Sequence, residues 1–253
     1  MIRLPPLRSS ARRLRDLLRP PGAVVISFPK SGRTQLRVML HAARLEALFS
    51  HAGSSEARAL EAHELTEALD YWQRHRVLFM IRDPRDTAVS AWFQARHRAE
   101  VYPGDLPGFL RDPRFGIEKI LLFHLMWLEA RERFPDFAVL RYESLQSEPD
   151  RAFRAAARFL AGVPPGDGRV ARAVEAGRFG SMRRLEESGE GAALFGQALA
   201  PGRGGGPESY KTRRGVVGGW RDEFSGEDSA FAEALFREHD YWARLDRAGV
   251  PAA

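Results

Sequence analysis

Three short apolar runs, each followed by a polar turn and a helical pattern, constrain the fold of this chain more than any other feature. The runs cover residues 23–28, 77–81 and 137–141. Apolar runs of this length without polar alternation are typical of strands that are buried on both faces of a parallel sheet. The pattern predicts a single α/β domain with a central parallel sheet flanked by helices. Ligands of such sheets bind at the carboxyl ends of the strands, so we expect function in the turns after residues 28 and 81.

The helical segments between these runs have recognisable boundaries. After Gly32, apolar residues recur with a helical period on one face. Residues 117–134 predict a long helix. Ser147 with Asp150 three residues later predicts the start of another helix, which Gly162 ends.

Composition narrows the class of protein. The chain has 253 residues, a formal net charge of +6 and no cysteine, which excludes disulfides, thiolate metal sites and a cysteine nucleophile. Its basic residues are spread among acidic ones, so we expect small anionic ligands rather than nucleic acid. No apolar run approaches the roughly 18 residues of a membrane span. We therefore expect a cytoplasmic protein without an integral membrane segment.

Domain organisation follows from two unusual segments. Residues 1–22 are rich in Arg and lack the apolar stretch of a secretory signal, so they predict a basic N-terminal arm before one domain, residues 23–253. Residues 188–210 are rich in Gly and Ala and predict a flexible loop in place of a regular element. This loop is either a lid that orders over a bound ligand or a segment without such a role.

The turn at residues 29–34 (PKSGRT) predicts a binding site for an oxyanion. Gly32 permits a left-handed backbone, and the following helix directs its positive end at the turn. The spacing does not match the nucleotide triphosphatase loop. Only three of the 39 basic residues are lysines, and two of these lie in predicted loops: Lys30 and Lys211. Other side-chain donors of the turn are Ser31, Arg33 and Thr34.

Four segments, in order, resemble the sulfotransferases that use 3′-phosphoadenosine 5′-phosphosulfate (PAPS). Residues 26–36 (ISFPKSGRTQL) are similar to the phosphosulfate loop of that family, and residues 82–90 (RDPRDTAVS) to its 3′-phosphate motif. Residues 141–160 resemble its Y-E-D-L segment, and residues 213–224 (RRGVVGGWRDEF) its C-terminal R-K-G-x-x-G-D-W segment. The resemblance implies a P-loop-kinase-like sulfotransferase fold and transfer of a sulfuryl group from PAPS to a hydroxyl, releasing adenosine 3′,5′-bisphosphate (PAP).

The resemblance also implies a role for each candidate residue. Lys30 would stabilise charge on the leaving phosphate, and His51 would accept the proton of the attacking hydroxyl. Alternative bases are His63, His75 and a carboxylate such as Glu56. The 5′-phosphate would be held by Ser31, Gly32, Arg33 and Thr34. The 3′-phosphate would be bound by Arg82, Ser90, Arg213, Arg214 and Gly215. The residues near adenine would be Tyr142, Phe179 and Met182.

Two departures from the family pattern affect these expectations. Phe49 stands two residues before His51, where a Lys is frequent, which leaves Lys30 as the more isolated cation at the chemistry. Gln35 replaces the usual Trp that stacks on adenine, so nucleotide binding would depend more on Phe179 and on the phosphate contacts.

The acceptor and the competing functions complete these expectations. We expect a small-molecule or lipid-like hydroxyl compound as acceptor and no metal; the sequence does not indicate an oligomeric state. One alternative is a P-loop-like nucleotide kinase, for which Asp83 and Asp86 would hold magnesium. The other is a non-catalytic adenine-nucleotide-binding protein. Aromatic residues that either line an apolar acceptor pocket or belong to the core are Trp92, Phe93, Tyr102, Phe109 and Phe115.

Overall fold

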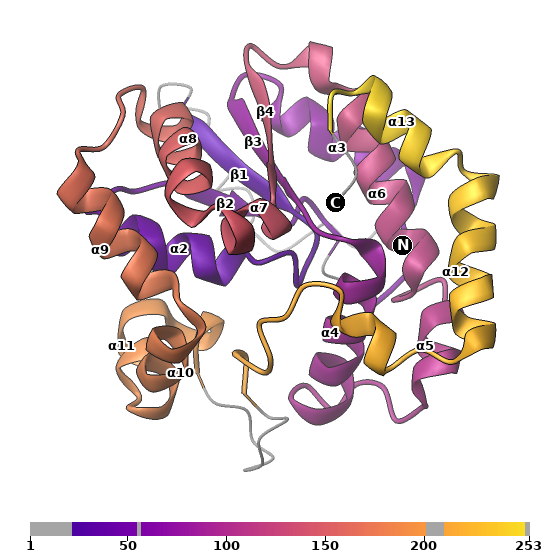
Figure 1. Ribbon diagram of the computed structural model, residues 1–253. Helices are drawn as coiled ribbons and strands as arrows, with labels where there is room; N and C mark the ends of the chain where they lie inside the picture. Colours follow the sequence, from indigo (N-terminus) through magenta and orange to yellow (C-terminus); the bar gives the residue numbers. More distant parts are fainter. Residues whose placement is uncertain (1–21, 55–56, 201–209, 251–253) are drawn as a thin grey trace, which may run out of the picture.

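Four short parallel strands form the central sheet in the order β2–β1–β3–β4. The computed structural model describes residues 22–54, 57–200 and 210–250, so the expected arm at residues 1–22 lies almost entirely outside the described residues. Figure 1 shows helices on both faces of the sheet. The predicted fold class is therefore confirmed. The strands are β1 (Ala23–Ser27), β2 (Leu48–Ser50), β3 (Arg76–Ile81) and β4 (Phe137–Arg141).

Helices connect the strands and continue the chain after β4. No helix in the described ranges is both long and apolar enough to cross a membrane. The α-helices are α2 (Arg33–Ala42), α3 (Ala62–Trp72), α4 (Pro84–His97), α5 (Leu106–Arg111), α6 (Ile117–Glu129), α7 (Tyr142–Ser147), α8 (Pro149–Ala161), α9 (Asp167–Gly177), α10 (Phe179–Glu187), α11 (Glu190–Phe195), α12 (Gly226–Glu238) and α13 (Tyr241–Arg247). Short 3₁₀ turns are η1 (Arg131–Arg133), η2 (Gly196–Ala198) and η4 (Gly219–Asp222).

The sheet is buried because successive strand residues point into two different hydrophobic clusters. Val24 and Ile26 of β1 belong to the cluster that includes residues of α6, α12 and α13. Val25 belongs to the cluster that includes residues of α2, α8 and α9. In β3, Phe79 belongs to the first of these clusters and Leu78 to the second. Burial on both faces explains why the strands read as continuous apolar runs in the sequence.

Some helix boundaries differ from the sequence-based expectation. Ser147 is the last residue of α7, and its hydroxyl donates to the Glu143 carbonyl (3.1 Å) instead of capping the next helix. Helix α8 begins at Pro149, since proline is well suited to a first helical position. Gly162 ends α8 in a left-handed conformation (φ 78°), as predicted. The helix expected at residues 117–134 ends at Glu129, earlier than predicted. A separate 3₁₀ turn, η1, follows at Arg131–Arg133.

The Gly- and Ala-rich segment at residues 188–210 is more regular at its start than we expected. Its first part forms α11 and the 3₁₀ turn η2. Gly191 of α11 is buried against Leu199, and a side chain at this glycine would meet Leu199 Cγ at 2.9 Å. Small residues here permit close packing, so their abundance does not by itself indicate a flexible loop.

Strand order places the candidate turns side by side. Strand β1 pairs with β2 on one side and with β3 on the other, and all pairs are parallel. The chain leaves β1 towards β2 and returns to β3 on the opposite side, which creates a crevice at the carboxyl ends of β1 and β3. In Figure 1 the segment that precedes η4 crosses these strand ends, between α10 and α4.

Candidate active site

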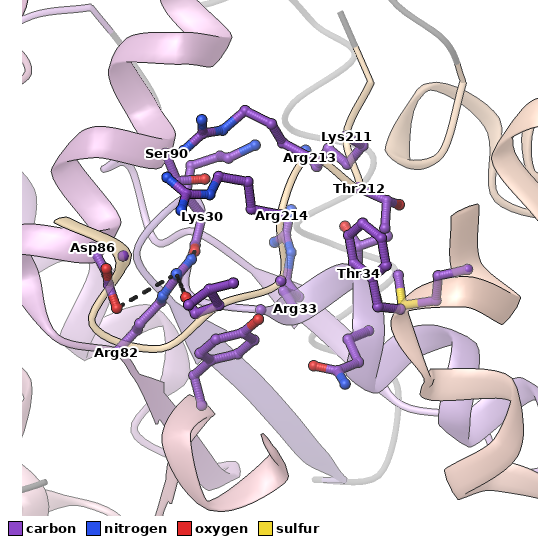
Figure 2. Close-up of a pocket in the computed structure, with 18 of the residues that line it drawn as sticks. Lys30, Arg33, Thr34, Arg82, Asp86, Ser90, Lys211, Thr212, Arg213 and Arg214 are labelled. Atoms are coloured by element: carbon purple, nitrogen blue, oxygen red, sulfur yellow. Dashed lines mark hydrogen bonds and ion pairs between the residues drawn. The ribbon is translucent and has the colours of Figure 1, made fainter. Parts of the chain in front are cut away.

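A pocket of about 290 Å³ lies at the carboxyl ends of β1 and β3. Every residue that the sequence assigned to the donor site, together with His51, lines it except Ser31, whose side chain is fully buried. Figure 2 shows basic side chains from three distant segments around this opening, near Lys30, Arg82 and Lys211. Lining residues to which the sequence assigned no role include Gln94, Gln146, Lys211 and Thr212.

The turn after β1 lines the pocket with backbone N–H groups and basic side chains. Lys30 has a positive φ of 73° and Gly32 one of 92°, so the backbone folds back at the start of α2. Gly32 is the N-cap of α2 and offers no side-chain cap, which leaves the first N–H groups of the helix for a ligand. A Cβ on Gly32 would lie 2.3 Å from Tyr142 Cδ2 and 2.8 Å from Met80 Cε. Only glycine fits here.

Gly32→Ala should therefore destabilise the protein by more than its backbone conformation alone explains. The left-handed conformation costs a non-glycine residue roughly 1–2 kcal/mol, and overpacking against Tyr142 adds about 1–3 kcal/mol. Gly162→Ala is the matched control, because Gly162 has a φ of 78° and a Cβ there would meet nothing within 4 Å. Urea unfolding of both variants measures the difference. Equal losses of stability would contradict the tight packing at Gly32.

Arg82 joins the turn after β3 to two other parts of the pocket. Its guanidinium donates to the carbonyls of Lys30 (3.4 Å) and Val216 (3.2 Å). It lies over the Tyr142 ring, 4.4 Å from the ring centroid. It also forms an ion pair with Asp86 at 3.6 Å, which Figure 2 shows. Arg82 Nε is buried without a hydrogen-bond partner among the described residues.

The two acids of this turn already have partners in the protein. Asp86 accepts hydrogen bonds from the N–H groups of Gly218 (2.7 Å) and Trp220 (3.0 Å), and so holds residues 210–224, the C-terminal segment, against α4. Asp83 caps α4 by accepting from the Arg85 N–H and binds the Arg85 side chain. Neither presents the free carboxylate that magnesium prefers. Across the described ranges, no three His, Asp or Glu side chains form a group that could hold a metal ion.

The C-terminal segment supplies two further arginines, and Gly215 of this segment packs against Phe179 of α10. Arg213 and Arg214 each lie 3.3 Å from the carboxylate of Glu223, which orients both guanidiniums. Gly215 has a φ of 67°, and a Cβ there would lie 2.7 Å from Phe179 Cδ2. Phe179 is 41% exposed and lines the pocket. The close approach of Gly215 therefore sets one edge of the site.

His51 follows β2 directly, at the same carboxyl-end edge of the sheet as the turn of residues 29–34 after β1. Its Nδ1 lies 2.8 Å from the Ser27 carbonyl oxygen, which can only accept, so Nδ1 carries the proton. Nε2 is then left with a free lone pair. Burial, followed by the charge of Arg33, lowers the pKa of His51 to about 3. The imidazole is therefore neutral at physiological pH and can accept a proton.

The alternative bases lie elsewhere. His63 is exposed and pairs with Glu61 on the surface. His75 is buried beside Trp72, with ring centroids 5.0 Å apart, and does not line the pocket. Glu56 lies outside the described residues. Among the described candidates, only His51 lines the pocket.

Lys30 is not the isolated cation that the sequence suggested. Lys30 Nζ and Lys211 Nζ both donate to Gln94 Oε1, at 3.0 and 3.3 Å. Burial lowers the pKa of Lys30 well below its usual value, and the charge of Lys211 lowers it further. Motif comparison missed Lys211 because it precedes the arginine motif; the scarcity of lysine was the only signal.

The pocket wall lacks the aromatic residue that the family pattern would place at Gln35. The Gln35 amide donates to the Gly177 carbonyl (2.9 Å) and accepts from Gln146 Nε2 (2.7 Å). These bonds hold Gln35 at the pocket wall. Phe179 and Met182 line the same pocket, so they provide the apolar surface on which a flat base could rest.

The five aromatic residues proposed for an acceptor pocket do not line this one. Phe109 is fully buried, and its ring packs against those of Tyr102 and Phe115 at 5.1 and 5.3 Å. Trp92 packs on Phe93 at 4.7 Å. These residues stabilise the packing around α4 and α5.

The fold and the pocket together define an α/β domain with a pocket rich in basic side chains at the carboxyl ends of β1 and β3. The chain belongs to the sulfotransferase family: the profile of the sulfotransferase domain matches residues 56–241. A comparison with curated protein sequences gives no match.

Solved structures share this fold. Mouse sulfotransferase SULT7A1 complexed with PAP has a TM-score of 0.64 and 19% identity, covering 91% of this chain and 90% of that chain. Retinol dehydratase in complex with androsterone and the inactive cofactor PAP has a TM-score of 0.60 and 18% identity, covering 92% and 84%. Retinol dehydratase in a complex with retinol and PAP has a TM-score of 0.61 and 19% identity, covering 92% of this chain and 85% of that chain.

Proposed function

We propose that this sulfotransferase uses PAPS as donor and transfers its sulfuryl group to the hydroxyl of a small-molecule or lipid-like acceptor, releasing PAP. The observation that carries the proposal is the meeting of the Lys30 turn, Arg82 and the free Nε2 of His51 in one pocket. Similar solved structures contain PAP, and two contain androsterone or retinol, which supports this donor and an acceptor of that size. The described elements from β1 to α13 surround one sheet, which supports a single domain at residues 23–253.

The proposed donor site has groups that match each charged part of PAPS. The turn amides with Ser31, Gly32, Arg33 and Thr34 would hold the 5′-phosphate at the start of α2. Arg82 and Ser90 would bind the 3′-phosphate, with Arg213, Arg214 and the Gly215 N–H reaching it from the C-terminal segment. Two buried groups, Arg82 Nε and the Thr212 hydroxyl, have no partner among the described residues and would gain one. Tyr142, Phe179 and Met182 would border adenine.

In the proposed transfer, His51 Nε2 accepts the proton of the acceptor hydroxyl as its oxygen attacks sulfur. The bond between sulfur and the bridging oxygen breaks, and its electron pair stays on that oxygen. Lys30 Nζ donates to the bridging oxygen and stabilises the charge that develops there. The geometry that supports these roles is the common pocket of Lys30 and His51, with the proton of His51 fixed on Nδ1.

Calorimetry tests the donor assignment. PAP, adenosine 5′-monophosphate and ATP are titrated into the protein, each with and without magnesium. We expect tight binding of PAP that requires the 3′-phosphate and is independent of magnesium. A preference for ATP with magnesium would overturn the proposal. A panel of phenols, alcohols and sterols is then screened with PAPS, with PAP release measured by chromatography, to identify an acceptor.

Arg82→Ala should weaken discrimination for the 3′-phosphate. A charge-assisted hydrogen bond is worth about 1.5–3 kcal/mol, so the preference for PAP over adenosine 5′-monophosphate should shrink by about 10- to 100-fold. Arg76→Ala is the matched control, because Arg76 lies at the other end of β3 with its guanidinium over Phe159. An unchanged preference in Arg82→Ala, measured by calorimetry, would remove Arg82 from the 3′-phosphate site.

A further inference from the structure

Two ammonium groups share one neutral acceptor in the lining of the pocket. Lys30 comes from the turn after β1 and Lys211 from the C-terminal segment, yet both bind Gln94 Oε1. Gln94 lies on α4 and carries no charge, so it orients the two ammonium groups without neutralising them. Like charges so close together repel each other. The arrangement concentrates positive charge beside the candidate base.

A buried carboxylate binds the backbone at Lys211. Glu186 on α10 is fully buried and accepts the N–H groups of Lys211 (2.6 Å) and Thr212 (2.9 Å). It also forms an ion pair with Arg98 at 3.3 Å. Glu186 therefore binds the backbone and Arg98, whereas the Lys211 ammonium group donates to Gln94.

The electrostatic surroundings of Lys211 indicate a site built for an anion. Burial, followed by the charges of Arg98 and Arg33, lowers the pKa of Lys211 to about 8, although Glu186 raises it. The charge of Lys211 also lowers the pKa of His51, and both residues line the pocket. A buried cation surrounded by other cations is stabilised when an anionic ligand binds.

We propose that Lys211 binds an oxygen of the transferring sulfuryl group, beside Lys30, and that Gln94 positions both ammonium groups for it. This inference rests on the proposed function. Lys30 then stabilises the bridging oxygen, which keeps the electron pair of the broken S–O bond. Lys211 holds a non-bridging sulfuryl oxygen while sulfur forms its new bond to the acceptor oxygen, whose proton passes to His51.

Binding of two nucleotides that differ only at the sulfuryl end tests this role without an acceptor. One is PAP; the other is the PAPS analogue in which a methylene group replaces the bridging oxygen and prevents transfer. Calorimetry gives both dissociation constants for the wild type, Lys211→Met and Lys119→Met. Lys119 is the matched control, because it is buried and donates to the Arg114 carbonyl at 3.0 Å without lining the pocket.

We expect Lys211→Met to reduce the preference for the analogue over PAP by about tenfold, as for a lost charge-assisted hydrogen bond. Its PAP affinity should stay within about threefold of the wild type, and Lys119→Met should match the wild type. An unchanged preference, or equal weakening of both nucleotides, would overturn the inference. Lys211→Gln, which can still bind Gln94, replaces the methionine variant if thermal unfolding shows that the latter is misfolded. Failure of the wild type to bind either nucleotide would instead refute the proposed function.

Discussion

Replacing Lys30 with methionine is expected to lower turnover by about 10²- to 10³-fold, the range seen when one donor to a developing negative charge is removed. Methionine keeps most of the length of the side chain but cannot donate to the bridging oxygen. The backbone contact of Arg82 to the Lys30 carbonyl remains, because it does not involve the side chain. Affinity for PAP should therefore change much less than turnover. PAP release under saturating PAPS and the screened acceptor measures the first quantity, and calorimetry the second.

The Lys30 substitution needs a control for the loss of a buried lysine. Lys119→Met removes another buried ammonium group, which lies outside the pocket, and should keep the wild-type turnover. Thermal unfolding of both variants separates loss of fold from loss of chemistry. If Lys30→Met retained full turnover, or if its turnover and PAP affinity fell by the same factor, Lys30 would not act on the leaving group.

Local sequence predicts the Lys30 turn well because its constraints are local. A continuous apolar strand, a turn with Gly32 and an amphipathic helix are read within 20 residues, and the structure has β1 and α2 in those places. The same applies to Arg82, which follows β3 directly. Parallel pairing of β1 with β3 then brings the two turns together, as the fold class requires.

Contacts between distant segments could not be predicted in this way. Asp86 follows a strand and resembles a metal ligand in sequence, but it holds the N–H groups of Gly218 and Trp220. Lys211 reaches Gln94 only because Glu186 fixes the backbone of the C-terminal segment. Each of these contacts joins residues more than 20 positions apart, and no local pattern encodes them.

Hydrophobicity was also an unreliable guide to ligand contacts. The aromatic group at Tyr102, Phe109 and Phe115 satisfied the description of an acceptor pocket equally well, yet its rings pack on one another. Burial of a large aromatic ring stabilises a core and a ligand site by the same mechanism. Only the position of each ring relative to the sheet distinguishes the two cases.

The environment of His51 keeps its Nε2 unprotonated, and therefore available to a proton, at ordinary pH. The Ser27 carbonyl fixes the proton on Nδ1, and burial keeps the pKa at about 3, so Nε2 stays unprotonated well below pH 6.5. The pH dependence of kcat/KM for the donor reports the ionisation of the free enzyme. Because the pKa of His51 is lowered, we expect no loss of kcat/KM between pH 7.5 and about 5.5 from its protonation. A decline centred near pH 6.5 would contradict this environment.

His51→Asn is expected to lower turnover by about 10²- to 10⁴-fold, the usual contribution of a general base. The asparagine amide can still donate to the Ser27 carbonyl in place of Nδ1, but it offers no basic nitrogen at the position of Nε2. Loss of activity would then follow from the missing base and not from a disrupted turn. A PAP affinity and a thermal unfolding temperature equal to those of the wild type would verify this. His63→Asn, the same change at an exposed histidine, should have no effect. If His51→Asn kept wild-type turnover with the screened acceptor, another group would have to accept the proton, and the proposed mechanism would lose its base.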